Sequence, residues 1–244
     1  MDQINYAKPP IIEAIVEFRY AEPMTAKRLL RLSEKIGKTY DATTAEEEVK
    51  FQLNLGSGSA DVIERMPVAK HTSRDQTELF IAKPCTLTWS RLAPYEGWDS
   101  FIARIAREYK IAATLGANRP LERIGLRFIN RIDVPLDPDS GVFRYEDFIA
   151  VTVGLPDLFD PVASYQWRID KVFSESKLMA VIQSATLMSE VPGTMGFLID
   201  IDVGANEGLP SKHDDIFNRL SDMRALKNEL FEVMITEHAR ESFR

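Results

Sequence analysis

The chain has 244 residues, which is enough for one large domain or for two smaller ones that share a core. Hydrophobic residues make up 45% and charged residues 27% of it, ordinary values for a folded protein that argue against disorder. The formal net charge of −7 disfavours a protein that coats nucleic acid through general electrostatics, although it leaves room for a local basic site.

Cysteine content and hydropathy indicate the cellular compartment in which the protein is expected. Cys85 is the only cysteine, so an intrachain disulfide is excluded and a reducing compartment is the simple inference. The N-terminal residues lack the basic segment and the apolar run of a signal peptide. No apolar stretch approaches the ~20 residues needed to span a bilayer. We therefore expect a cytoplasmic protein that does not act at a membrane.

Alternation of apolar and polar residues predicts antiparallel strands in the first half of the chain. The pair Pro9–Pro10 blocks a helix and introduces the first strand, residues 11–20. The Gly-Ser-Gly-Ser segment at 56–59 marks the turn of a hairpin. Further strands are predicted over residues 47–55, 61–68, 76–82 and 85–92.

Helical spacing of apolar residues predicts two helices in the same half. Thr25 caps the first helix, which closes at Gly37. The second and stronger helix covers residues 98–115. The spacing of Tyr95, Trp98 and Phe101 favours packing in the core over stacking on nucleic-acid bases.

The segment 123–131, Arg-Ile-Gly-Leu-Arg-Phe-Ile-Asn-Arg, carries the most informative pattern. Side chains alternate in a strand, so Arg123, Arg127 and Arg131 share one face and an apolar row occupies the other. Residues 101–132 carry a net charge of +5, which leaves −12 for the rest of the chain. Three guanidinium groups on a sheet require anions beside them, from the protein or from a ligand.

Two interpretations of this arginine face stay open. Glu13 and Glu17 alternate on the polar face of the first strand, and they neutralise the arginines if the two strands are neighbours. Otherwise Arg123, Arg127 and Arg131 form an anion-binding surface for a nucleotide or another polyanion. The internal interpretation is favoured, because paired charges on a sheet are common.

The second half begins after a turn-forming segment at 135–141 and repeats the pattern of strands followed by a long helix. Strands are predicted over residues 162–173, 178–187 and 194–203. The triplet Arg-Ile-Asp occurs at 131–133 and again at 168–170, which hints at a duplication. Ser211 caps this C-terminal helix. Its wide apolar stripe would pack in the core or form a homodimer. The stripe includes Ile216, Leu220, Met223, Leu230 and Met234.

Antiparallel strands followed by an amphipathic helix, twice over, predict an α+β protein. We expect two lobes of mainly antiparallel sheet, each packed by a long amphipathic helix. Their boundaries would be residues 1–134 and 142–244, and one continuous domain is the alternative.

Asp170, Asp200 and Asp202 are the candidates for a metal site. Asp200 and Asp202 share one strand face, where two carboxylates could hold a hard cation or act as an acid–base pair. The competing interpretations are a solvated strand face and pairing with arginines of the first half. No histidine lies at ligand spacing, and all three histidines are expected at the surface. We therefore assign no metal and no cofactor.

Four motifs of this sequence occur together in one bacterial family. Pro9–Pro10 and Glu13–Ala14 match an opening strand, and residues 123–131 match a central Arg-x-Gly-Leu-Arg-x-x-Asn-Arg strand. Residues 95–98 match a Tyr-x-x-Trp helix start, and 231–236 match a Phe-Glu-x-x-Ile-Thr ending. Over nearly its whole length the chain thus resembles a sporadically distributed bacterial family of uncharacterised proteins. The resemblance implies length and organisation, but it carries over no activity and no catalytic residue.

No catalytic motif is assembled in the sequence. We therefore expect a non-enzymatic binding or interaction protein that presents a charged sheet face to a protein partner or an anionic ligand. The alternative is a metal-assisted enzyme or a binder that acts on phosphorylated ligands or nucleic acid through the arginine strand. The surroundings of Arg127 distinguish the two functions. If Glu13 or Glu17 pairs with the Arg127 guanidinium, the alternative loses its main anion-binding group. If the guanidinium faces a cleft that contains the aspartates, the alternative gains support.

Overall fold

One antiparallel sheet organises the described part of the chain, which comprises residues 6–54, 56, 59–136, 144–151 and 164–244 of a computed structural model. The strands lie side by side in the order β2-β3-β4-β5-β1-β6-β9-β8-β7. Their bounds are β1 Ile11–Tyr20, β2 Ala42–Asn54, β3 Ser59–Thr72, β4 Glu78–Lys83, β5 Thr86–Leu92, β6 Leu121–Pro135, β7 Gln166–Phe173, β8 Leu178–Met188 and β9 Thr194–Ala205.

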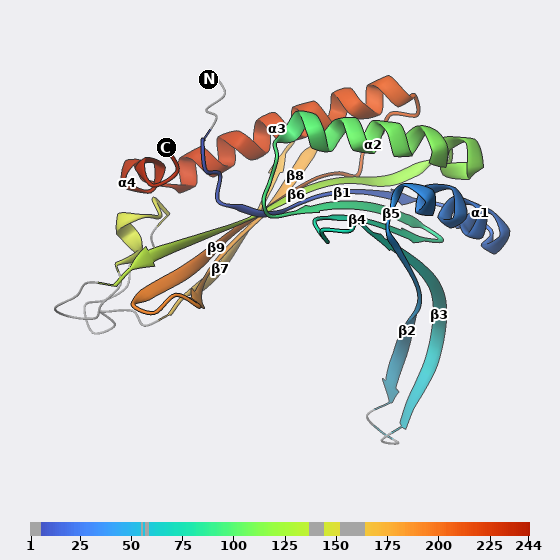
Figure 1. The fold of residues 1–244 in the computed structure, drawn as a ribbon, viewed down its shortest axis with the longest axis horizontal. Helices are drawn as coiled ribbons and strands as arrows, with labels where there is room; N and C mark the ends of the chain where they lie inside the picture. The colour runs from blue at the N-terminus through green and yellow to red at the C-terminus, as the bar shows by residue number, and fades with distance from the viewer. Residues whose placement is uncertain (1–5, 55, 57–58, 137–143, 152–163) are drawn as a thin grey trace.

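The described helices lie on one face of this sheet, and none of them covers the other face (Figure 1). The longer ones are α1 (Ala26–Ile36), α2 (Trp98–Ala112) and α3 (His213–Met234), and a short α4 (Glu237–Glu241) follows. Single helical turns lie at η1 (Gly37–Thr39), η2 (Ala113–Ala117) and η3 (Tyr145–Asp147). Within the described ranges, no helix has both the length and the hydrophobicity that crossing a bilayer requires.

The hydrophobic core lies between the sheet and the helices. Alternate residues of β1 and β6 are buried on this side, as the period of a strand requires. Phe18 of β1 meets Trp89 of β5 and Tyr109 of α2 edge to face, at centroid distances of 5.5 and 5.3 Å. The remaining residues of β1 and β6, which include the arginines of β6, lie on the helix-free side.

The two halves of the chain repeat one topology within this sheet. In each half a first strand is followed by a meander whose last strand pairs with the first, and a helix comes next. Thus β1 pairs with β5 before α2, and β6 pairs with β9 before α3. The strands β1 and β6 pair with each other and join the halves. The α+β class with an antiparallel sheet is confirmed, but the ranges 1–134 and 142–244 share one continuous sheet instead of forming two.

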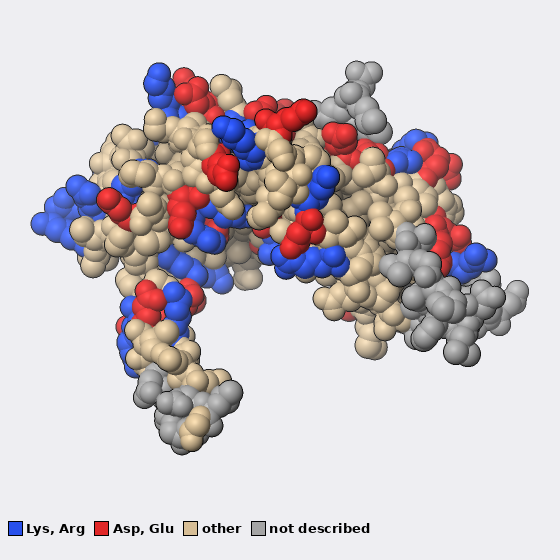
Figure 2. Space-filling model, turned by 180° about the vertical axis from the view of Figure 1, so that it is seen from behind, with Lys and Arg blue, Asp and Glu red and all other residues tan. Residues whose placement is uncertain are grey.

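The β2–β3 hairpin extends from the sheet as an arm (Figure 1). Only residues 69–72 of β3 pair with β4, so the outer part of the hairpin pairs with itself alone. Ion pairs such as Lys50–Glu64, at 2.7 Å, cross it, and Figure 2 shows charged side chains near its root and uncharged ones farther out. Its large exposed apolar residues are Phe51, Leu53, Val62 and Ile63.

Most predicted element boundaries agree with the structure to within a few residues. Thr25 caps α1 as expected, and its Oγ1 accepts a hydrogen bond from the backbone N–H of Arg28. Lys212, however, and not Ser211, occupies the N-cap of α3, and its side chain makes no capping bond. The Arg-Ile-Asp triplets lie in β6 and β7, which are not equivalent strands of the repeat. Most of the predicted turn at 135–141 lies outside the described residues.

His71 is buried, which corrects the expectation that all histidines lie at the surface. Its Nδ1 lies 2.9 Å from Thr43 Oγ1, and its Nε2 lies 3.2 Å from Ser33 Oγ. Burial lowers the pKa of His71, which favours the neutral ring. The imidazole therefore serves to tie α1 to β2 and β3.

Candidate functional site

Carboxylates of the protein neutralise the arginine face of β6. Arg127 Nε and Nη2 donate to the two carboxylate oxygens of Asp200 at 2.8 and 2.5 Å, in a bidentate pair. The side chain of Asp200 is only 11% exposed, whereas that of Arg127 is 42% exposed. Arg131 pairs with Asp133, two residues along the same strand, at 3.0 Å.

Arg123 crosses the sheet over two glycines to reach its partner. Its Nη2 donates to both carboxylate oxygens of Asp202 at 2.8 Å, and its Nη1 lies 3.6 Å from Glu17. A Cβ atom on Gly125 would lie 2.1 Å from the Arg123 guanidinium, and one on Gly204 would lie 3.1 Å from it. Gly125, the glycine of the Arg-x-Gly-Leu-Arg segment, therefore leaves the space that the Arg123 guanidinium occupies.

Arg127 is the guanidinium whose surroundings decide between the two interpretations of the strand. Its partner is Asp200 of β9 and not the predicted Glu13 or Glu17, although Glu17 does approach Arg123. The prediction that a carboxylate of the protein pairs with Arg127 is therefore confirmed. The carboxylate belongs to Asp200, however, and the prediction of Glu13 or Glu17 was wrong for this arginine. Pairing of second-half aspartates with first-half arginines, which was one of the open interpretations, is the arrangement observed.

The three aspartates considered for a metal site do not converge. Asp200 and Asp202 each bind an arginine. Asp170 lies two strands away from Asp202 on β7, where Arg168 Nε donates to it at 2.8 Å. In the described parts of the chain, no group of three His, Cys, Asp or Glu side chains is placed to hold a metal ion. This face is an array of ion pairs of both signs.

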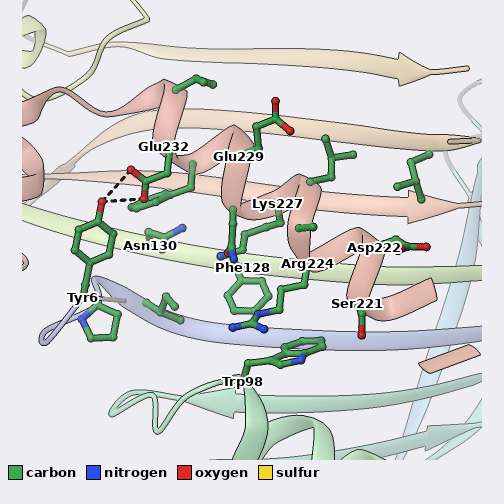
Figure 3. A pocket seen from close by; sticks show the side chains of 18 of the residues that line it. Tyr6, Trp98, Phe128, Asn130, Ser221, Asp222, Arg224, Lys227, Glu229 and Glu232 are labelled. Carbon is green, nitrogen blue, oxygen red and sulfur yellow. Dashed lines mark hydrogen bonds between the residues drawn. The ribbon is translucent and has the colours of Figure 1, made fainter. Parts of the chain in front are cut away.

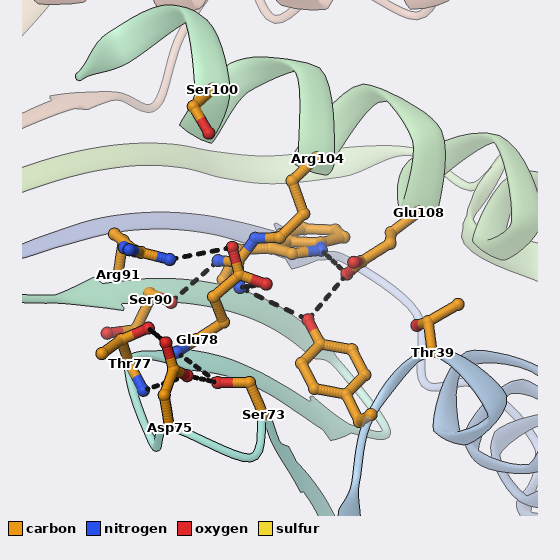
Figure 4. Close-up of polar contacts among 12 residues, drawn as sticks. Thr39, Ser73, Asp75, Thr77, Glu78, Ser90, Arg91, Ser100, Arg104 and Glu108 are labelled. Carbon is orange, nitrogen blue, oxygen red and sulfur yellow. Dashed lines mark hydrogen bonds and ion pairs between the residues drawn. The ribbon is translucent and has the colours of Figure 1, made fainter. Parts of the chain in front are cut away.

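A buried polar network joins α2 to the sheet (Figure 4). Arg104 of α2 is 3% exposed, and its Nη2 donates to the carbonyl oxygen of Ser90 at 2.8 Å, with Glu78 3.4 Å from its Nη1. One turn later Glu108 accepts a hydrogen bond from Trp89 Nε1 at 2.9 Å, and burial raises the pKa of its carboxyl. Both buried side chains of α2 that carry a charge, Arg104 and Glu108, therefore have partners, which is the pattern of a structural network.

A groove runs along α3, and we call it the α3 groove (Figure 3). One wall comes from α3 itself and another from β6. Further lining comes from the segment that leads into α2 and from Tyr6, Ala7, Pro9 and Pro10. Its aromatic, cationic and amide side chains include Tyr6, Tyr95, Trp98, Phe128, Asn130, Arg224, Lys227 and Phe231.

Lys227 points from α3 toward the sheet inside this groove (Figure 3). It is 6% exposed, and its Nζ lies 4.1 Å from the centroid of the Phe128 ring. Within the described chain no hydrogen bond or ion pair reaches this amine. Burial, and secondarily the charge of Arg224, lowers the pKa of Lys227 to about 7. A cation–π contact thus replaces the anion that a buried ammonium normally has.

Arg224 lies one turn earlier on the same helix and is also without an anion. Its guanidinium carbon lies 5.2 Å from the centroid of the Trp98 ring, and no carboxylate of the described residues pairs with it. Glu232, whose charge acts on the buried amine, is already engaged. Tyr6 Oη donates to it at 2.8 Å and Arg240 Nε at 3.0 Å.

Neutral polar groups and aromatic faces complete the lining of the groove. Asn130 is 2% exposed, and its Nδ2 donates to the carbonyl oxygen of Ile199 at 3.0 Å. Tyr95 meets Phe128 edge to face at 5.8 Å, and burial raises the pKa of its hydroxyl, so it stays a neutral donor. The groove therefore combines two cations without counter-charges, hydrogen-bonding groups and flat apolar surfaces, which is the chemistry of a ligand site.

Reasoning from the sequence missed both cations of the groove. The predicted apolar stripe of the last helix runs through Ile216, Leu220, Met223 and later residues. Lys227 follows Met223 by four residues and therefore falls on the same stripe. A lysine inside an apolar stripe was the signal that could have found it. Tyr95 and Trp98 were placed in the core, and the structure puts them both against the core and along the groove.

Loss of Arg127 should destabilise the protein, because Asp200 would be left largely buried without its bidentate partner. We expect Arg127→Met to lower the free energy of unfolding by about 1–2 kcal/mol, in the range for an unsatisfied charged group at a partly exposed site. Urea unfolding measures this change. Arg168→Met is the matched control: its pair with Asp170 is exposed on both sides, and its removal should leave stability nearly unchanged. Equal effects of the two substitutions would contradict the assignment.

Loss of Lys227 should stabilise the protein and change the pH dependence of its stability. The pKa of Lys227 falls from 10.5 to about 7 on folding, so between these values the unfolded chain holds a proton that the folded chain has released. The free energy of unfolding therefore rises with pH in this window. Lys227→Met should raise stability at pH 6 by about 1–4 kcal/mol and abolish that rise.

Urea unfolding at a series of pH values tests this expectation. The control is Lys35→Met on α1, where the side chain is exposed and the substitution should change neither stability nor its pH profile. A destabilised Lys227→Met variant would show that the amine has a structural partner and would remove the basis of the site.

Comparisons with known proteins add little to this geometry. No family model and no curated protein matches the chain. Among solved structures it is similar to the S. pombe Pct1 RNA triphosphatase in complex with the Spt5 CTD, at 10% identity, with 90% of this chain and 84% of that chain covered and a TM-score of 0.19. A second structure of the same triphosphatase gives 9% identity, 91% and 84% coverage and a TM-score of 0.20. Scores this low support no inference about function, and the resemblance to the bacterial family stays a prediction.

Proposed function

We propose that this protein is a binding protein for a small organic anion, which it holds in the α3 groove. The observation that carries the proposal is Lys227, a buried ammonium side chain without an anion, in a groove that is open to ligands. Such a group destabilises the folded chain unless something else compensates it. An anionic ligand supplies the missing hydrogen bonds, and hydrogen bonds to charged groups contribute about 1.5–3 kcal/mol each.

The contrast between the two equivalent helices supports this interpretation. Arg104 on the inner face of α2 is as deeply buried as Lys227 on the inner face of α3. The chain surrounds Arg104 with a carbonyl oxygen and a carboxylate, and it leaves Lys227 with an aromatic ring alone. The fold can therefore supply hydrogen-bonding partners to a buried cation on the inner face of a helix. The lack of such a partner at Lys227 is consistent with a ligand-binding site.

The surrounding side chains indicate the kind of anion. Arg224 offers a planar fork that matches a carboxylate or a phosphate group. Phe128, Trp98 and Tyr95 offer aromatic surface to an apolar or aromatic body. A ligand with one carboxylate on a planar apolar group fits this combination best. With a net charge of −7 the protein does not attract anions in general, so recognition rests on these local groups.

The helix-free face of the sheet supports a second candidate, the docking of a protein partner. Its charges occur as partly exposed pairs of both signs, such as Arg123 with Asp202, and no element of the described chain covers them. Positive and negative side chains are also interspersed on the surface that Figure 2 presents. A phosphorylated ligand or a nucleic acid would have to displace the carboxylates first, so the alternative that uses Arg123, Arg127 and Arg131 has less support. Dimerisation through α3 stays a prediction, because its main apolar stripe packs toward the sheet.

Phenylacetate is the probe that tests the α3 groove. Ligand at about 100 times its dissociation constant raises the free energy of unfolding by about 2.7 kcal/mol, which corresponds to roughly 5–10 °C for a chain of this size. We expect thermal unfolding to shift in this range with phenylacetate. Neither Lys227→Met nor Arg224→Met should respond, and Lys35→Met should respond like the wild type.

The neutral analogue 2-phenylethanol separates recognition of charge from hydrophobic contact. It has the same ring but no carboxylate, and it should leave the transition unchanged. An equal shift with the two compounds, or a shift that both groove variants retain, would count against the proposal.

Nucleic acid should not bind to the arginine strand. Because Arg123, Arg127 and Arg131 each have a carboxylate within 3.6 Å, few phosphate contacts and little counterion release are available. Short single-stranded RNA and duplex DNA, measured by fluorescence anisotropy at low salt, should show no saturable binding. Salt-dependent binding that Arg127→Met weakens would instead restore the alternative function.

A further inference from the structure

We propose that the amine of Lys227 condenses reversibly with the keto group of a 2-oxo acid whose carboxylate is held by Arg224. This inference rests on the proposed function, since it concerns the same groove, and it names the class of anion: a carboxylate next to a ketone, on an apolar body. The structure assigns to the α3 groove not only binding but covalent capture.

The geometry of the groove provides the two groups that such a ligand needs. Lys227 and Arg224 extend from adjacent turns of α3 toward the sheet, with the Phe128 ring between their ends in the view of Figure 3. In a 2-oxo acid the carboxylate and the ketone are directly bonded, so capture requires the long, flexible side chains of Lys227 and Arg224 to converge at the edge of the Phe128 ring. The aromatic rings of Trp98 and Tyr95 then lie where the rest of the ligand can pack.

Access and freedom of the amine distinguish Lys227 from other lysines. An amine engaged by a carboxylate must first break that ion pair before it can react, as Lys50 must with Glu64 and Lys83 with Glu48. Lys227 has no such bond among the described residues, and it lines the groove. Desolvation beside a second cation is the environment in which lysine amines act as nucleophiles toward carbonyl compounds.

Burial, helped by the charge of Arg224, keeps part of the Lys227 amine neutral and therefore reactive at neutral pH. Arg224 on the same helix disfavours the ammonium form, Glu232 favours it, and the Tyr95 hydroxyl from the segment before α2 is neutral. Because burial dominates, the pKa of Lys227 is lowered to about 7, so about half of these amines are neutral at pH 7. For an ordinary lysine the neutral fraction is about one in 3,000.

The condensation balances without any oxidant or reductant. The lone pair of the neutral amine forms a bond to the ketone carbon, and the carbonyl oxygen becomes a hydroxyl group. That oxygen then leaves as water with the two hydrogen atoms of the amine, and a carbon–nitrogen double bond remains. Water reverses the reaction, so capture is reversible. Arg224 keeps the carboxylate, and its positive charge persists throughout.

Borohydride trapping with phenylpyruvate tests the inference on the full chain. Borohydride adds a hydride to the carbon–nitrogen double bond and makes the linkage permanent, so the protein should gain the mass of one phenylpyruvate less one oxygen atom. We expect a single adduct at pH 7, which peptide mapping places on Lys227. Lys227→Met should abolish it and Arg224→Met should reduce it at least tenfold. Lys35→Met, in which the replaced lysine is exposed, should react like the wild type.

Phenyllactate, in which a hydroxyl replaces the ketone, separates binding from condensation. It should raise the thermal transition and compete with phenylpyruvate for trapping, and it should leave no adduct of its own. If phenylpyruvate shifts the transition but no adduct forms, covalent capture is wrong and the proposed function stands. If neither compound shifts the transition nor reacts, both are wrong. An adduct spread over many lysines, or one that Lys227→Met retains, also overturns the inference.

Discussion

The central strand β6 sets the two demands that the rest of the molecule meets. One of its faces is apolar and must be buried, and the other carries three arginines that must be neutralised. The helices α2 and α3 meet the first demand on one side of the sheet. The aspartates of β9, Glu17 of β1 and Asp133 of β6 itself meet the second on the other side. Because carboxylates come from strands on both sides of β6, its charge pattern also helps to fix which strands are its neighbours.

Buried charge is handled differently by the two helices that cover the sheet. On α2, Arg104 and Glu108 each find hydrogen-bonding partners and thereby connect the helix to β4 and β5. On α3, Lys227 and Arg224 lie against aromatic rings and lack a counter-charge in the described chain. The first arrangement is compensated within the protein and the second is not. This local destabilisation occurs in one of the two halves and not in the other. It therefore indicates a function at that place, because stability is commonly lost where function requires it.

Much of the fold could be predicted from local patterns in the sequence. Alternation located β1 and β6, the Gly-Ser-Gly-Ser segment located the hairpin, and the threonine cap located α1, because each is an interaction between near neighbours in the chain. The partner of Arg127 could not be found in this way. Asp200 lies on a strand that pairs with β6 across a long intervening segment, and its register depends on the whole second half.

The candidate site was harder to predict for a related reason. A lysine at a buried position of an amphipathic helix resembles a lysine whose stem crosses the apolar stripe and whose ammonium reaches solvent. Only the packing of α3 against Phe128 shows that the Lys227 side chain lies against the sheet, with its ammonium group over an aromatic ring. The sequence also suggested two lobes, because it contains the repeat but not the β1–β6 pairing that joins both halves.

Both ends of the described chain contribute to the lining of the α3 groove, together with β6 and the segment before α2. The backbone N–H of Lys8 donates to the carbonyl oxygen of Phe243 at 3.0 Å, and the rings of Tyr6 and Phe243 meet edge to face at 5.4 Å. During synthesis the residues of β1 and β6 leave the ribosome long before those of α3, so the sheet can begin to assemble while the groove is still incomplete. The capacity to hold a ligand therefore appears only after α3 has been made, and a ligand in the cell would stabilise the molecules in which α3 has packed on the sheet.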